Sequence, residues 1–93
     1  MKTIHVDGIR IDILKESNRV IMFDTKNTLS RDKSREIMAY LDYEGFLDDM
    51  IDGAVLSPED QKEFPPIRVI VRKITGSISI DTDDYTSKDL WKD

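Results

Sequence analysis

Residues 67–74 constrain the fold more than any other stretch of this chain. Apolar residues occupy both alternating sets of positions, with Ile67, Val69 and Val71 in one set and Ile70 and Ile74 in the other. A strand that is wetted on one face alternates apolar and polar residues throughout. Because this segment alternates only in part, it predicts a central strand with cover on both faces.

The length and composition indicate one small soluble domain. A chain of 93 residues predicts a single domain spanning 1–93. A chain of this size buries roughly 60–65% of its unfolded surface, which allows one modest core. It has no cysteine, which fits a reducing compartment. No apolar run approaches the ~20 residues of a membrane span, and the first residues lack the apolar core of a signal peptide, so we expect a cytoplasmic protein.

The N-terminal third predicts a three-stranded meander. Residues 2–6 and 9–13 alternate apolar and polar residues on either side of Asp7-Gly8, a pair suited to the two positive-φ positions of a type I′ turn. The polar residues 15–18 then form a second turn. Residues 19–23 follow as the third strand.

The middle of the chain predicts helices. Ser30 is the preferred N-cap of the first helix, with Thr28 as the competing cap, and Ile37, Met38 and Leu41 follow at helical spacing. Gly45 ends or kinks this helix. Apolar residues from 46 to 51 predict a second short helix or a continuation of the first, and Ser57-Pro58 predicts the start of a third.

After the central strand, residues 75–77 predict a tight turn and residues 78–80 a short returning strand, which the acidic residues 81–84 end. Trp91 is expected to cover part of the core. The predicted fold class is therefore α+β: a small antiparallel sheet of about five strands, in the order β-β-β-α-α-β-β, with helices packed on one face.

The sequence carries no recognisable catalytic motif. It lacks a cysteine nucleophile, a glycine-rich phosphate loop and a nucleophile elbow, and its only histidine is His5. Residues 81–86 resemble a calcium loop faintly, but Thr86 stands where such a loop needs glycine and Lys92 where it needs a bidentate glutamate. We therefore predict a non-enzymatic protein without a metal or another cofactor, although a small enzyme or ligand binder that uses carboxylate pairs stays an alternative.

The most distinctive feature is a gap in positive charge. No lysine or arginine lies between Arg35 and Lys62, and residues 42–63 carry eight acidic residues and one basic residue. If the helix ran through Gly45, carboxylates at i, i+4 and i+8 would form a column roughly 6 Å apart, with two tyrosines beside it. The predicted partner-binding residues are Tyr40, Tyr43, Glu44, Asp48, Asp49 and Asp52.

These residues predict a small acidic module that binds a basic protein partner. A negative surface with adjacent aromatic side chains suits a groove built to hold nucleic-acid phosphates, so we expect a phage- or mobile-element-type inhibitor that blocks a nucleic-acid-binding protein. Direct nucleic-acid or membrane binding is not expected. The simpler interpretation is a solvated acidic face.

The sequence allows two other interaction surfaces, one apolar and one basic. The apolar residues Ile70 and Ile74, together with Trp91, could instead form a homodimer interface, which would make the chain a self-associating structural protein. Basic residues could also converge into a small patch, although scattered solvated charges are the favoured interpretation; these residues are Arg31, Lys33, Arg35, Arg68, Arg72 and Lys73.

Overall fold

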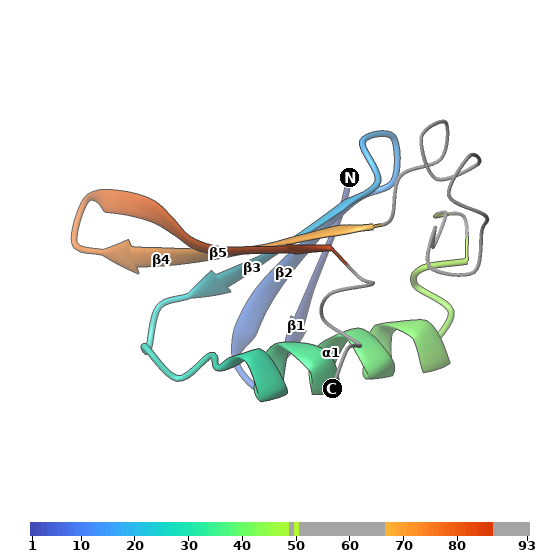
Figure 1. Ribbon diagram of the computed structural model, residues 1–93, viewed down its shortest axis with the longest axis horizontal. Coiled ribbons are helices and arrows are strands. Elements are labelled where there is room, and N and C mark those ends of the chain that lie inside the picture. Colours follow the sequence, from blue (N-terminus) through green and yellow to red (C-terminus); the bar gives the residue numbers. More distant parts are fainter. Residues whose placement is uncertain (49, 51–66, 87–93) are drawn as a thin grey trace.

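The computed structural model describes residues 1–48, 50 and 67–86. Within these residues the chain forms a five-stranded sheet with one helix against one of its faces (Figure 1). The elements are β1 (Lys2–Val6), β2 (Ile9–Leu14), β3 (Arg19–Asp24), α1 (Arg31–Tyr43), β4 (Arg68–Thr75) and β5 (Ile78–Thr86). The predicted α+β class is thus confirmed at the level of a small sheet with helical cover.

The sheet is mixed rather than antiparallel. Its strand order is β1-β2-β3-β4-β5, and β3 pairs with β4 in parallel while the other pairings are antiparallel. The predicted all-antiparallel sheet is therefore wrong. The physical reason is the return path: α1 carries the chain back along the sheet after β3, so β4 starts at the end where β3 started and runs the same way (Figure 1).

The predicted meander of β1, β2 and β3 is confirmed. Asp7 and Gly8 have φ values of 52° and 79°, as a type I′ turn requires, and Val6 pairs with Ile9 across it. The turn between β2 and β3 closes with a hydrogen bond that the Asn18 amide donates to the Lys15 carbonyl (3.2 Å).

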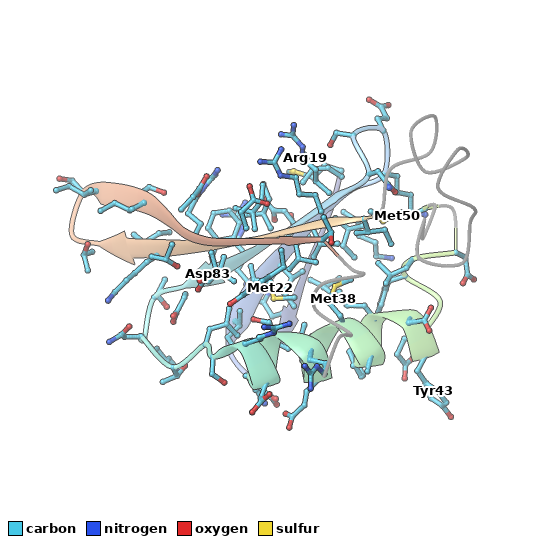
Figure 2. All side chains as sticks on the ribbon, viewed as in Figure 1. Arg19, Met22, Met38, Tyr43, Met50 and Asp83 are labelled. Carbon is cyan, nitrogen blue, oxygen red and sulfur yellow. The ribbon has the colours of Figure 1, made fainter. Side chains whose placement is uncertain are left out.

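One face of the sheet and one face of α1 enclose the core. Val20 and Met22 of β3 lie in register with Val69 and Val71 of β4, and all four side chains are buried. Met22 and Met38 lie in the layer between the sheet and the helix (Figure 2). The helix contributes Ile37, Met38 and Leu41, so its predicted apolar stripe is confirmed.

The N-terminus of α1 is capped as predicted. The Ser30 side chain accepts a hydrogen bond from the Lys33 amide at 3.1 Å, which satisfies one of the free amides of the first turn. Thr28 is not the cap. Its backbone amide instead donates to the buried carboxylate of Asp24 (3.1 Å), which also accepts from the Leu29 amide (3.3 Å).

The C-terminus of α1 is a Schellman motif. Gly45 takes a left-handed φ of 81°, its amide donates to the Asp42 carbonyl (3.1 Å), and the Phe46 amide donates to the Leu41 carbonyl (2.9 Å). The prediction that Gly45 ends the helix is thereby confirmed. The described residues that follow lie in turns, so a helix continuing from 46 is wrong for them. The third predicted helix and Trp91 lie outside the described residues.

The last strand is longer than predicted. β5 runs through Thr86, so the prediction that residues 81–84 end the strand is wrong, and so is the faint calcium-loop alternative. Two aspartates of this segment face arginines of β4: Asp81 binds Arg72 (2.7 Å) and Asp84 binds Arg68. This pairing offsets the low strand propensity of aspartate.

Candidate partner-binding surface at the end of α1

The predicted binding residues that the structure describes gather at the C-terminal end of α1. We call Tyr40, Asp42, Tyr43, Glu44 and Asp48 the acidic end of α1. Tyr43 is 88% exposed and points away from the sheet (Figure 2), and Tyr40 is 44% exposed. Glu44 and Asp48 are also exposed. Asp49 and Asp52 lie outside the described residues.

The predicted column of carboxylates is wrong in its geometry. It needed helical geometry through Gly45, whereas the helix ends at Tyr43 with Glu44 as its C-cap. Asp48 lies in the turn that follows, where its amide donates to the Gly45 carbonyl (3.3 Å). Its carboxylate folds back toward Gly45. The acids therefore surround the end of the helix instead of lining one side of it.

Among the described residues, the charges at this end of α1 are unfavourable for the helix. The C-terminus of a helix carries the negative end of its dipole, where cations are stabilising and anions are not, by about 0.3–1 kcal/mol each. The last turn of α1 contains no basic residue. Within the described part of the chain, none of Asp42, Glu44 and Asp48 forms an ion pair. Lys2 lies over the ring of the adjoining Phe46, 4.9 Å from its centroid.

A cleft adjoins the acidic end through Tyr40. It has a volume of about 340 Å³ and lies between β1 with its turn and one side of α1. Its lining consists of His5, Val6 and Asp7 from the sheet side and Lys33, Glu36, Ile37 and Tyr40 from the helix.

Lys33 lies between the two carboxylates of the cleft. The Lys33 ammonium lies 2.6 Å from an Asp7 oxygen and 3.7 Å from a Glu36 oxygen. The hydrogen bond to Asp7 raises the pKa of Lys33. Lys33 is therefore bound mainly to Asp7, and Glu36 is the carboxylate with bonding capacity to spare.

The face of the sheet opposite α1 arranges its charges differently. The guanidinium groups of Arg10 and Arg72 lie over the ring of Phe23, 4.7 Å and 5.8 Å from its centroid. Figure 2 shows Arg19 on this same side. Ile70 of β4 lies on this face and is only 7% exposed, and Val69 and Val71 are buried on the face toward α1, so the predicted cover on both faces of β4 is confirmed at these residues.

Arg10, Arg68 and Arg72 of this face are each paired with a carboxylate. Asp12, which is 5% exposed, accepts hydrogen bonds from Arg10 (3.1 and 3.2 Å) and from the Thr3 hydroxyl (2.8 Å). Hydrogen bonds from Arg72 and Arg68 lower the pKa values of Asp81 and Asp84 respectively.

Four of the basic residues that the sequence allowed to converge into a patch have separate partners instead. Arg68 and Arg72 are tied to aspartates of β5, Lys33 is tied to Asp7, and Arg31 lies over the ring of Tyr85 at 5.8 Å. The favoured interpretation of separate charges is thereby supported.

Residues 1–48, 50 and 67–86 contain no group of three or more histidine, aspartate or glutamate side chains that could hold a metal ion. They also contain no helix that is long and apolar enough to cross a membrane. Comparison of the chain with protein-family models, with curated proteins and with solved structures finds no match.

Sequence reasoning found the acidic end but missed the cleft beside it. His5, Val6 and Asp7 are far from Tyr40 along the chain, and only the packing of α1 against β1 brings them together. A signal was present in part: Lys33, Glu36, Ile37 and Tyr40 recur at helical spacing on one side of α1.

Proposed function

We propose that this protein is a non-enzymatic binding module whose acidic end of α1 docks onto a basic surface of another protein. The observation that carries the proposal is the concentration of exposed carboxylates at the negative end of a helix dipole, without a basic residue in the last turn. The arrangement costs stability in the free protein, and a cationic partner would reverse the sign of that contribution. Tyr40 and Tyr43 add exposed amphipathic area of the kind that anchors interfaces.

The partner we propose is a protein with a lysine- and arginine-lined groove, such as a nucleic-acid-binding enzyme. Blocking that groove would make the module an inhibitor of the kind that phages and mobile elements produce. Electrostatic complementarity of this type acts mainly on the association rate and is screened by salt. The proposed complex therefore forms quickly at low salt and weakens as salt rises.

The test uses a basic peptide probe, an acetylated and amidated (Lys-Arg)4 peptide with a fluorescent label. We expect binding that weakens between about 50 and 200 mM salt, and a loss of at least about tenfold in affinity for the double variant Glu44→Lys/Asp48→Lys. The matched control is Glu16→Lys/Asp32→Lys, which makes the same change in net charge at exposed positions outside the acidic end.

The control is expected to change the affinity by less than about threefold, since only distant charges differ. Equal losses in the two double variants would mean that net charge alone attracts the peptide, and the proposed docking surface would be wrong. Failure of the wild-type protein to bind the peptide at low salt would also reject it.

Self-association stays the alternative. It depended on a spare apolar face containing Ile70 and Ile74. Ile70 is only 7% exposed, which weakens the case for a dimer through this face, while Ile74 is half-buried. Sedimentation at micromolar concentration decides the matter: a single species of 10.8 kDa excludes the dimer, and a species of twice that mass supports it.

A further inference from the structure

We infer that the cleft between β1 and α1 is a receptor for one arginine side chain of the basic partner. This inference rests on the proposed function, because it assigns one contact within the same docking surface. The cleft shares Tyr40 with the acidic end of α1, so a chain that lies across that end passes the mouth of the cleft.

The size of the cleft suits a single side chain. Its volume of about 340 Å³ lies at the lower limit of the ~300–1,000 Å³ that small-molecule sites occupy. Its apolar lining comes from Val6, which is half-buried, and Ile37, which is 1% exposed. These two side chains can contact the three methylene groups of an arginine stem, which favour apolar surroundings while the charged group stays at a polar rim.

The charge of the cleft selects a cation. Its lining holds the carboxylates of Asp7 and Glu36 against the one ammonium of Lys33. Because Lys33 is held by Asp7 at 2.6 Å and lies 3.7 Å from Glu36, an incoming cation can bind Glu36 without breaking the stronger pair.

The geometry favours a guanidinium over an ammonium. Glu36 and Tyr40 are four residues apart on α1 and therefore neighbours on one side of the helix. A carboxylate can accept two parallel hydrogen bonds from a planar guanidinium, and an aromatic ring can stack on its flat face. A lysine ammonium binds a carboxylate only as a point charge, and it has no flat face to stack on an aromatic ring.

The experiment uses monomeric probes, so it does not depend on the polycation test above. N-acetyl-arginine N-methylamide and its lysine counterpart are each titrated into the ¹⁵N- and ¹³C-methyl-labelled protein. We expect the arginine probe to shift signals of Val6, Ile37 and Tyr40, with a dissociation constant at least about fivefold lower than that of the lysine probe.

Two variants and a matched control locate the site. Glu36→Gln is expected to weaken the arginine probe by about fivefold or more, and Tyr40→Leu to remove most of the preference for arginine over lysine. Glu44→Gln makes the same chemical change outside the cleft and is expected to alter the affinity by less than about twofold. Unchanged backbone spectra show that each variant is folded.

Three results would overturn the inference: equal affinity for the two probes, shifts that spread over the acidic end without centring on the cleft, or equal losses in Glu36→Gln and Glu44→Gln. Each of these can occur while the basic peptide still binds the acidic end, in which case the docking surface stands and its arginine receptor does not. If the arginine probe binds selectively but the basic peptide does not bind at low salt, the cleft binds arginine and the proposed docking surface is wrong.

Discussion

The open face of the sheet and the acidic end of α1 both present charged side chains, and they arrange them in opposite ways. On the open face, Arg10, Arg68 and Arg72 are each bound to an aspartate. At the acidic end, the described carboxylates have no basic partner. The first arrangement completes the fold, whereas the second leaves unpaired charge at the surface.

The difference shows how the sheet face that α1 does not cover can be shielded from water in the described part of this small α+β protein. The stems of arginine side chains can cover apolar surface while their charged groups remain at the solvent. Phe23 lies under two such groups, so arginine side chains cover this part of the face opposite α1.

The largest expected contrast is between two aromatic residues. Phe23→Ala removes the ring under Arg10 and Arg72, and we expect it to lower the free energy of unfolding by about 1–3 kcal/mol, somewhat less than a fully buried phenylalanine. Tyr43→Ala, at an 88% exposed position, should change it by less than about 0.5 kcal/mol. Urea unfolding measures both free energies. Equal losses would mean that Phe23 contributes no more to the stability of the fold than the exposed Tyr43.

The next contrast is between two aspartates. Asp12→Ala removes a buried acceptor that serves Arg10 and Thr3, and it should cost about 1–3 kcal/mol, since a charged donor loses its partner. Asp48→Ala should stay within about 0.5 kcal/mol of the wild type. Thermal unfolding and urea titration give the free energy of unfolding of each variant. A stabilised Asp12→Ala protein would contradict the role assigned to the Arg10–Asp12 pair.

A smaller effect of opposite sign is expected at the end of the helix. Glu44→Lys replaces an anion by a cation at the negative end of the dipole, so it should raise the free energy of unfolding by about 0.3–1 kcal/mol at low salt. Glu16→Lys, in the exposed turn before β3, is the control and should have a smaller effect. If Glu44→Lys destabilised the protein, Glu44 would have a structural role that its exposure does not reveal.

The smallest contrast depends on pH. The pKa of Asp84 lies below its ordinary value of 3.8 because Arg68 donates hydrogen bonds to its carboxylate. A lowered pKa in the folded state means that the pair contributes stability above pH 3.8 and loses it as the pH falls through the folded pKa. Asp84→Asn should therefore be less stable than the wild type at pH 6, and the difference should shrink as the pH falls below 3.8.

Arg68→Gln removes the other partner and should show the same pH dependence. The pair is about half exposed on both sides, so its effect should be the most sensitive to salt of those considered. A difference that does not shrink as the pH falls below 3.8 would mean that the substitution acts through packing and not through the charge.

Local chemistry was predictable from the sequence, and long-range pairing was not. Asp7-Gly8 between alternating segments and Ser30 before a helical stripe each determine a turn or a cap through adjacent residues. The parallel pairing of β3 with β4 depends on the path of α1 across the sheet, for which no short pattern exists.

The acidic part of β5 was missed because aspartate is depleted from strands and the basic side chains that offset it lie on β4. Counting back from the turn at Gly76 places Arg72 opposite Asp81, and that register was available as a signal. The composition of the acidic end was likewise evident from the sequence. Its shape was not, since it depended on whether Gly45 interrupted the helix, and the cleft needed the docking of α1 on β1.

The parallel contact between β3 and β4 also has a kinetic consequence. The hairpins β1–β2, β2–β3 and β4–β5 join neighbouring segments, whereas β3 meets β4 only after residues 25–67 have been closed into a loop. Loop closure costs entropy that grows with the logarithm of loop length, and non-local strand pairing slows folding. The two halves of the sheet are therefore expected to be joined late, with the seam between β3 and β4 as the last part of the molecule to close.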